Sequence, residues 1–243
     1  MKPLAIDLYC GLGGWAEGFL SEGYRVIGFD IEQFDYPGEL VLRDVMSISG
    51  AEIVMRYGIP RVIVASPPCQ EPSYRAMPWT RAQKLNRKGP PFTFIQLFEA
   101  CFRIRLEVSV AARFTVPLVI ENVRGARRWV GWSKAHFGSY YLWGDVPADL
   151  PKTSAAAEHA KAVGIKHGGD CFSDPTWPGK QGGTKQSGIS GPRKNGKGDR
   201  WFQDGAAQHG SKSAKRKAAS AAIAKIPFPL AQHIARCFKP EAA

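Results

Sequence analysis

The sequence predicts an α/β fold in which helices cover both faces of a twisted, mostly parallel sheet. Short apolar runs alternate with longer mixed segments over residues 4–143, which is the pattern of consecutive βαβ units. Some of these runs stop at once at glycine or proline, as buried strands do at fixed turns. The chain has 243 residues, 44% of them hydrophobic, which is enough for one full domain with a small addition.

Six apolar runs have the length of strands, and three segments between them have the composition of helices. The expected strands are Leu4–Tyr9, Arg25–Phe29, Leu40–Leu42, Arg61–Ala65, Pro117–Glu121 and Tyr140–Leu142. The expected helices are Trp15–Glu22, Ala51–Tyr57 and Thr93–Arg113. In sheets of this kind, ligands bind at the carboxyl ends of the strands.

The rest of the chain divides by composition. After a core over residues 1–143, residues 144–212 are rich in glycine and lysine, and residues 213–243 are expected to be helical and to return to the core. The last expected helix, Leu230–Phe238, has apolar residues at helical spacing. Pro227 and Pro229 are expected to form a break between it and the alanine-rich helix expected over residues 213–225.

The charge balance favours a polyanionic partner, with nucleic acid first. The chain has 33 Lys and Arg against 21 Asp and Glu, a net charge of +12. Residues 151–217 alone hold 13 basic against 5 acidic residues. Residues 164–210 are either a solvated linker or a segment that orders on DNA, with lysines on phosphates and tryptophans on bases.

Cysteine usage and hydropathy indicate a cytoplasmic protein. The five cysteines are scattered and no CxxC pair occurs, so neither a disulfide framework nor a zinc site is indicated and no metal is expected. No apolar run approaches the roughly 20 residues that span a bilayer, and the N-terminus lacks the pattern of a signal peptide. We therefore expect a monomer in the cytosol, without a membrane partner.

The most informative pattern follows the fourth expected strand. The run Val62–Ala65 stops at Pro67-Pro68, and Cys69 comes next. Two prolines fix two φ angles and hold the following residue in place, which suits a nucleophile presented at the end of a strand. The alternative is a buried structural cysteine in a tight loop. The polar, basic segment 74–91 follows directly and is expected to be a mobile loop near the site.

A second pattern follows the first strand. The segment Asp7–Gly14 reads DLYCGLGG and leads into a helix, and glycines at such a turn let the backbone approach a ligand closely. Asp30 ends the second strand, 19 residues after Gly11, where a carboxylate can accept hydrogen bonds from ribose hydroxyls. Asp44 follows the third run and can meet a nucleobase amino group. Their alternative roles are a helix cap or surface acid for Asp30 and a helix N-cap for Asp44.

Three motifs together resemble the DNA cytosine-5 methyltransferase family. DLYCGLGG resembles its first motif, Ser66–Gln70 (SPPCQ) with Ser73 its nucleophile motif, and Glu121–Val123 (ENV) its third signature; they occur in the family's order. Residues 226–238 resemble its last motif more loosely. The resemblance, closest to a short phage-like or bacterial member, implies a Rossmann-like S-adenosylmethionine-dependent methyltransferase fold. Residues 1–143 would be its catalytic core and 144–212 a reduced target-recognition region.

The resemblance also implies roles for single residues: Asp30 holds the ribose of S-adenosylmethionine, Ile31 covers the adenine, and Asp44 meets its amino group. Cys69 attacks C6 of a flipped cytosine, and Glu121 contacts N3 and the exocyclic amine. The expected catalytic residues are Cys69, Gln70, Ser73, Glu121 and Asn122. The expected cofactor-binding residues are Asp7, Leu8, Tyr9, Gly11, Gly13, Gly14, Asp30, Ile31, Asp44, Val45 and Pro67. The expected contacts with double-stranded DNA are Arg75, Arg124, Arg193, Lys194, Arg200 and Trp201.

The chemistry independently requires a thiol and an acid. C5 of cytosine is a poor nucleophile, and adding a thiolate to C6 while N3 is protonated or hydrogen-bonded makes C5 enamine-like. A thiol is nucleophilic near neutral pH and can leave again. Glu121 must donate to N3, so burial should raise its pKa; its alternative role is a buried acid paired with a nearby arginine, Arg124, Arg127 or Arg128. The base must leave the stack, and the 74–91 loop is the candidate to fill the gap.

The chain departs from the family pattern in three places. The Gln-x-Arg-x-Arg segment expected after Glu-Asn-Val is absent, and residues 136–144 stand in its place, so a supporting arginine comes from Arg193 or Arg200 or is missing. The last motif lacks its asparagine near Ala224 and Lys225. The short recognition region predicts a short or relaxed target sequence.

Three functions remain open at this point. The leading hypothesis is methylation of C5 of cytosine in double-stranded DNA, for which protection from restriction, restriction partnership and phage genome modification fit equally well. A second keeps the chemistry on RNA or a free cytosine nucleotide. A third is a non-catalytic DNA-binding protein on a degenerate methyltransferase scaffold. Retention of both Cys69 and Glu121 argues against the third, because a scaffold needs neither.

Overall fold

The computed structural model describes residues 2–69, 92–151, 221 and 224–240. The chain divides into two compact units, residues 1–151 with 226–243, and residues 152–225, and the fold described below is that of the first unit. The expected loop 74–91 lies outside the described residues, and the expected helix 213–225 does so almost entirely. The boundaries expected at residues 143 and 212 remain predictions.

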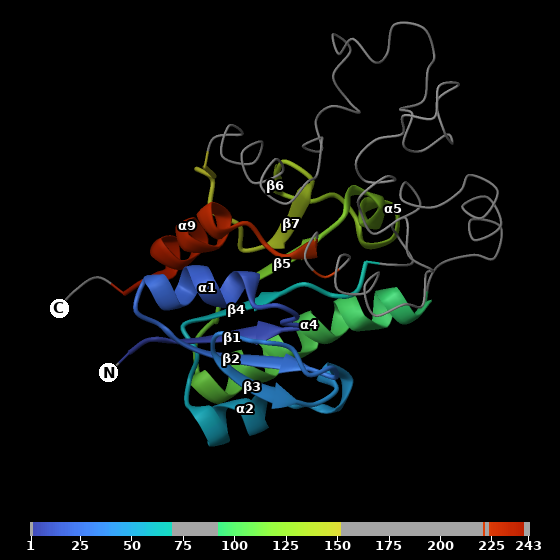
Figure 1. The fold of residues 1–243 in the computed structure, drawn as a ribbon. Coiled ribbons are helices and arrows are strands. Elements are labelled where there is room, and N and C mark those ends of the chain that lie inside the picture. The colour runs from blue at the N-terminus through green and yellow to red at the C-terminus, as the bar shows by residue number, and fades with distance from the viewer. Residues whose placement is uncertain (1, 70–91, 152–220, 222–223, 241–243) are drawn as a thin grey trace, which may run out of the picture. The chain divides into compact units, whose positions relative to one another are not determined.

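A seven-stranded sheet forms the centre of the first unit, in the order β3-β2-β1-β4-β5-β7-β6 (Figure 1). The first five strands of this order are parallel, β7 is antiparallel to β5, and β6 is antiparallel to β7. The strands are β1 Leu4–Leu8, β2 Arg25–Asp30, β3 Glu39–Leu42, β4 Val62–Ala65, β5 Leu118–Asn122, β6 Ala135–Phe137 and β7 Tyr140–Gly144. Apart from the inserted β7, this is the 3-2-1-4-5-6 order of dinucleotide-binding folds. The chain has a Rossmann-like fold.

The six expected strands are confirmed, each within one or two residues at its ends. They are recognisable because the strands in the middle of the sheet are buried on both faces and therefore form continuous apolar runs; all residues of β1, β4 and β5 are buried. The additional strand β6 was not predicted. Its three residues, Ala-His-Phe, are too few to show a strand period, and they form a strand only by pairing with β7.

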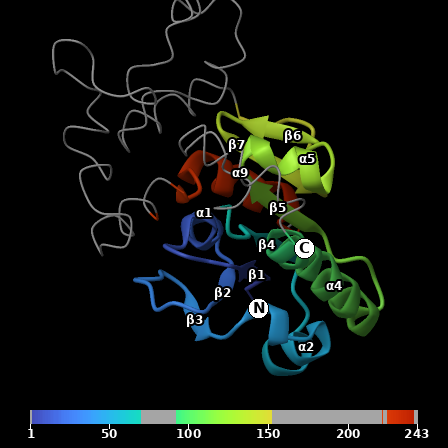
Figure 2. The same ribbon diagram turned by 90° about the vertical axis from the view of Figure 1, so that its right-hand side faces the viewer.

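Helices cover both faces of the sheet, as expected (Figure 2). On one side lie α1 (Gly14–Ser21) and α9 (Phe228–Phe238), and on the other lie α2 (Gly50–Tyr57) and α4 (Phe92–Ala112). Buried residues of α4 recur every three or four positions and join the main core, so one face of this helix packs on the sheet. They are Phe94, Phe98, Cys101, Ile104 and Val108.

Glycines allow α1 to pack closely on α9 and on the segment that precedes it. A Cβ atom on Gly18 would lie 2.4 Å from the backbone nitrogen of Gln232, and one on Gly14 would lie 2.5 Å from the nitrogen of Ile226. The helix α9 begins two residues earlier than expected, and Pro229 lies in its first turn. The interpretation of Pro229 as a break was wrong, because a proline in the first turn lacks only an N–H group that has no partner within the helix.

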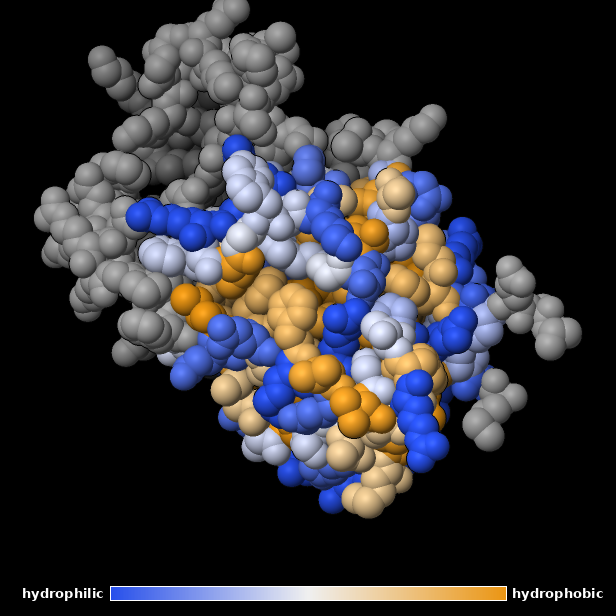
Figure 3. All heavy atoms as spheres, turned by 180° about the vertical axis from the view of Figure 1, so that it is seen from behind, coloured by the Kyte–Doolittle hydropathy of each residue, from blue (hydrophilic) through white to orange (hydrophobic). Residues whose placement is uncertain are grey.

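Shorter helices were not predicted. They are η1 (Val45–Ser47), η3 (Arg124–Ala126) and α5 (Arg127–Val130), each too short for a hydrophobic period. No helix in the described part of the chain is long and apolar enough to cross a membrane. On the side opposite to Figure 1, apolar side chains lie among charged ones without forming one continuous surface (Figure 3).

Candidate active site

The three sequence motifs meet at the carboxyl ends of neighbouring strands. β2 lies on one side of β1 and β4 on the other, so the chain order reverses beside β1, and such a switch point is where parallel sheets bind ligands. The backbone N–H of Ser66 donates to the carbonyl oxygen of Leu8 (3.1 Å), and Ala65 pairs with Ile120 of β5. The ends of β1, β4 and β5 therefore form one continuous edge.

The glycine-rich turn after β1 has the conformation that its sequence predicts. Gly11 and Gly13 have positive φ angles of 49° and 74°, which glycine adopts without strain. The Gly11 N–H donates to Oδ2 of Asp30 (3.0 Å), and Oδ1 of Asp30 accepts from the backbone of Glu32 (3.0 Å). Gly11 and Asp30 are thus in contact, and Asp30 holds the turn in place.

Three of the expected cofactor residues have side chains directed elsewhere. Leu8 is fully buried in the core, and Tyr9 points toward α4, where its hydroxyl donates to the carbonyl of Leu97 (2.9 Å). Val45 is likewise buried, whereas Ile31 is 72% exposed beside Asp30. An apolar side chain this exposed next to the turn is available to cover a flat ligand.

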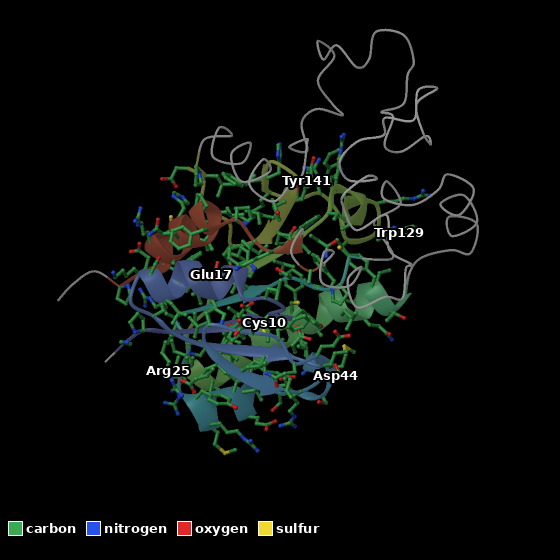
Figure 4. The ribbon with its side chains drawn as sticks, viewed as in Figure 1. Cys10, Glu17, Arg25, Asp44, Trp129 and Tyr141 are labelled. Carbon is green, nitrogen blue, oxygen red and sulfur yellow. The ribbon has the colours of Figure 1, made fainter. Side chains whose placement is uncertain are left out.

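Asp44 has the alternative role that its position also predicted. Its Oδ1 accepts from the backbone N–H of Met46 (2.9 Å), and it is the N-cap of η1. The side chain is exposed and lies just beyond the end of β3 (Figure 4). Because a carboxylate can accept several hydrogen bonds, the cap leaves acceptor capacity for a base.

Asp7 is the most unusual acid at this edge. It is completely buried, its Oδ2 accepts from the hydroxyl of Tyr36 (3.1 Å), and its Oδ1 has no hydrogen-bond partner among the described residues. Burial raises the pKa of Asp7 well above its usual range, and the charge of Asp30 adds to this, while the Tyr36 hydrogen bond opposes it. A buried, unpaired carboxyl oxygen is costly, and a cationic group would satisfy it.

Tyr36, which the sequence did not predict, covers the glycine-rich turn. A Cβ atom on Gly13 would lie 2.4 Å from Cδ of Pro37 and 2.9 Å from Cδ2 of Tyr36, and one on Gly28 would lie 2.5 Å from Cζ of Tyr36. The Tyr36-Pro37 segment therefore packs directly on the glycine-rich turn and on β2. No local pattern marks Tyr36, because its contacts are made by a loop without periodicity.

The turn that carries Cys69 is held by Asn122. The Asn122 side-chain amide donates from Nδ2 to the carbonyl of Pro67 (2.8 Å), while its Oδ1 accepts from the N–H of Val123 (2.9 Å). Asn122 is almost completely buried, so this bond is shielded from water. Cys69 is half-buried two residues after the anchored Pro67. Asn122 therefore holds the turn that precedes Cys69.

Glu121 has the property that the chemistry requires. Burial raises the pKa of its carboxyl group to about 8, and a hydrogen bond with Ser66 opposes this shift. The Ser66 Oγ in turn accepts from the indole Nε1 of Trp15 (3.0 Å). Since the single hydroxyl proton of Ser66 is then available to Glu121, the chain Trp15–Ser66–Glu121 orients the carboxyl group. Sequence reasoning assigned no role to Trp15 and only a motif position to Ser66.

Nearby arginines have other partners. Arg127 donates to the Ser133 hydroxyl, and its guanidinium lies 4.9 Å from the Trp132 ring centre and 4.4 Å from that of Tyr141. Arg128 lies over Trp129, and Trp129 and Tyr141 are labelled in Figure 4. No arginine contributes to the pKa of Glu121, so among the described residues the alternative of an arginine-paired Glu121 is not supported.

The β6–β7 hairpin occupies the place of the missing Gln-x-Arg-x-Arg segment. His136 stacks on Tyr141, with ring centres 5.0 Å apart. Tyr140 is buried, and burial followed by the charge of Glu121 raises the pKa of its hydroxyl, which places Tyr140 within electrostatic reach of Glu121. Of the aromatic side chains in this hairpin, Tyr140 is thus the one that lies near Glu121.

Several predicted residues are not tested by the geometry. Arg124 lies in η3 directly after β5. The others lie outside the described residues: Gln70, Ser73, Arg75, Arg193, Lys194, Arg200 and Trp201. Surface hollows lined by Lys2, Arg25 and their neighbours lie at the opposite, amino edge of the sheet and contain none of the predicted site residues.

Comparisons with known proteins find structural similarity only. No protein-family model and no curated protein matches the chain. Similar solved structures include a putative DNA modification methyltransferase from an Escherichia coli prophage (21% identity, 54% of this chain, 35% of that chain, TM-score 0.39). Others are the Dnmt2 methyltransferase of S. pombe (16%, 54%, 37%, TM-score 0.35) and the methyltransferase EhMeth of Entamoeba histolytica (17%, 54%, 41%, TM-score 0.37). The chain spans about two fifths or less of their lengths.

Proposed function

We propose that the chain transfers a methyl group from S-adenosylmethionine to C5 of cytosine in double-stranded DNA, through a covalent bond between Cys69 and C6 of a flipped base. The observation that carries this proposal is the buried carboxyl group of Glu121, which has a pKa of about 8. Glu121 directly precedes Asn122 in the sequence, and Asn122 anchors the turn that precedes Cys69. An acid that keeps its proton at neutral pH and a thiol at adjacent strand ends are the pair that this reaction needs.

The residues at the β1 end fit the cofactor. S-adenosylmethionine carries an ammonium and a sulfonium cation, and the buried Oδ1 of Asp7 lacks a partner among the described residues. The Gly11–Asp30 turn presents backbone groups and a carboxylate for a ribose, and the exposed Ile31 offers an apolar surface for an adenine. When bound, S-adenosylmethionine supplies an electrophilic methyl group.

The protein's own residues act on the cytosine. Cys69 loses its proton to solvent and forms a bond to C6, while Glu121 donates its proton to N3, and the electron pair gained by the ring makes C5 nucleophilic. After C5 takes the methyl group, it loses its original proton to a base, the C5=C6 bond forms again, and the Cys69 thiolate leaves. N3 returns its proton to Glu121. Asn122 keeps Cys69 in position through its hydrogen bond to the carbonyl of Pro67.

The choice of DNA as substrate rests on charge. The net charge of +12 and the basic excess within residues 151–217 suit a polyanion, and we assign target recognition to residues 144–212. RNA or a free cytosine nucleotide is the alternative substrate for the same chemistry. The exposed Trp132 and Arg127 beside it suit either nucleic acid, because base stacking tolerates any base.

The test measures the product directly. The protein is incubated with S-adenosylmethionine and unmethylated duplex DNA, RNA of the same sequence, or deoxycytidine monophosphate, and the nucleosides are analysed by mass spectrometry. We expect 5-methyldeoxycytidine from the duplex alone, and none from Cys69→Ala. The matched control is Cys101→Ala, in the core of α4 and outside the site, which should retain activity. Cofactor binding without any methylated product, or activity in Cys69→Ala, would contradict the proposal.

A further inference from the structure

Three side chains of ligand type converge at a place that the methyl-transfer chemistry does not use. Asp149 follows β7, and His233 and Cys237 lie one turn apart on α9. One carboxylate oxygen of Asp149, one ring nitrogen of His233 and the sulfur of Cys237 all lie within 4.8 Å of one another. The Nε2–Sγ distance is 3.4 Å and the Nε2–Oδ1 distance is 3.8 Å.

The arrangement differs from that of a nucleophilic cysteine triad. In a triad, the carboxylate binds one ring nitrogen of the histidine and the nucleophile faces the other. Here both Asp149 and Cys237 approach the same nitrogen, Nε2 of His233. Three donor atoms that surround one point are arranged as the ligands of a cation.

The distances suit a small tetrahedral ion. Zinc binds sulfur at about 2.3 Å, nitrogen at about 2.0–2.1 Å and oxygen at about 2.0–2.2 Å, so two such ligands at a tetrahedral angle lie about 3.3–3.6 Å apart. The His233–Cys237 separation of 3.4 Å lies close to the nitrogen–sulfur value, which is at the upper end of this range. The Asp149–His233 separation of 3.8 Å is slightly longer, and the Asp149 side chain, which is 86% exposed, has room to rotate toward the ion.

We propose that Asp149, His233 and Cys237 form a Zn²⁺ site whose fourth ligand is water. A sulfur, a nitrogen and an oxygen donor together favour a borderline metal over Mg²⁺ or Ca²⁺, which take oxygen ligands. Each ligand binds in its deprotonated form, so the Cys237 thiol gives its proton to solvent when the metal enters.

The place of the site in the chain suggests a structural role. Asp149 lies just before the region that begins at residue 152, and α9 follows soon after that region ends at residue 225. A bound ion would therefore link the end of the first core segment, at Asp149, to α9, which begins the second core segment after residues 152–225. It would also fix the outer face of α9, whose inner face packs on α1.

The sequence did not reveal this set of ligands. The His-x-x-x-Cys spacing on α9 supplies two ligands on one helix face, but it is not a CxxC pair, and Asp149 comes from a distant part of the chain. Only the packing of α9 beside the segment after β7 brings the third ligand into place.

The test loads the purified full chain with Zn²⁺, removes the excess by dialysis and measures bound metal. We expect one tightly held Zn²⁺ in the wild type and in Gln232→Ala, a neighbouring change on α9, and loss of binding in His233→Ala and Cys237→Ser. Because Cys237 is exposed and His233 keeps 23% of its side chain exposed, the variants should keep the wild-type circular dichroism spectrum. With Co²⁺ as the probe, a thiolate charge-transfer absorption should appear in the wild type and be absent from Cys237→Ser.

A second measurement does not depend on any variant. Zn²⁺ should protect Cys237 of the wild-type protein from alkylation by iodoacetamide, as followed by peptide mass spectrometry, and a chelator should restore the reaction. No retained metal, metal retained equally by Cys237→Ser, or alkylation of Cys237 that Zn²⁺ does not slow would each overturn the site. None of these readouts requires methyl transfer, so they stand apart from the proposed function.

Discussion

Burial sets the protonation state of Glu121, and that state is the property on which the proposed chemistry depends. A carboxyl group with a pKa of about 8 keeps its proton at pH 7, whereas an exposed glutamic acid has lost it. The causes are specific: the end of β5 is enclosed by its neighbours, and the one described hydrogen-bond partner, Ser66, only partly compensates for the burial.

The first prediction concerns the pH dependence of methyl transfer. Since Glu121 acts in its protonated form, the single-turnover rate should fall as pH rises through about 8, apart from the opposite effect of Cys69 ionisation. Glu121→Gln cannot donate a proton, so its rate should be lower by a factor of about 10²–10⁴ and should no longer fall at alkaline pH. Its affinity for S-adenosylmethionine should stay unchanged. Glu39→Gln, on exposed β3, is the control. A Glu121→Gln enzyme with wild-type rates would remove Glu121 from the mechanism.

The second prediction concerns the Trp15–Ser66–Glu121 chain. Ser66→Ala removes the hydrogen bond that lowers the pKa of Glu121, so the alkaline fall in rate should move to higher pH. It also leaves the buried indole N–H of Trp15 without its acceptor, at a cost of about 1–3 kcal/mol. In a Trp15→Phe background that cost should largely disappear, and urea unfolding of the four proteins measures the difference. Equal losses in both backgrounds would show that the chain is not coupled.

At the scale of elements, close helix packing holds α9 against the core. The backbone of α9 approaches α1 so closely that a methyl group at Gly18 would lie 2.4–2.5 Å from atoms of Gln232 and Ala231. The hydroxyl of Tyr24, after α1, also donates to the carbonyl of Ala235 in α9 (3.1 Å). The C-terminal helix is thereby part of the same layer as the helix that follows the glycine-rich turn, although more than 200 residues separate the two contacting groups.

The third prediction tests this packing. In an isolated helix, alanine is favoured over glycine by about 1 kcal/mol, yet Gly18→Ala should destabilise the protein by about 1–3 kcal/mol, because backbone rather than a flexible side chain blocks the new methyl group. Met55→Ala, a change in α2 at a position that is 79% exposed, should stay within about 0.5 kcal/mol of the wild type. Thermal and urea unfolding measure both. A stabilised Gly18→Ala would mean that α9 is not packed on α1 in solution.

At the scale of the whole molecule, features that depend on a local sequence pattern were predicted. Contacts between segments that are distant in the sequence were missed. The buried strands were recognisable as apolar runs, and Cys69, Glu121 and the Gly11–Asp30 pair belong to motifs at strand ends. The contacts of Tyr36 with Asp7 and of Trp15 with Ser66 join separate segments, and no spacing within one segment encodes them. The aromatic hairpin at the place of the expected arginines is likewise visible only once β7 is paired with β5.

The last prediction asks whether the positive charge acts locally or as a whole. The slope of log K for duplex DNA against log salt concentration counts phosphate contacts, at about 0.9 for each contact. If Arg193 and Lys194 contact phosphates, the double variant Arg193→Ala/Lys194→Ala should lose two contacts and have a correspondingly shallower slope. The double variant Arg25→Ala/Arg56→Ala removes the same charge from residues that pair with Glu39 and Glu52. Fluorescence anisotropy over a salt series measures both.

Because Arg25 begins β2 at the amino edge of the sheet, away from the proposed site, the control variant should keep the wild-type slope. Equal slopes in the two double variants would show that net charge alone draws the protein to DNA, and would remove Arg193 and Lys194 from the interface.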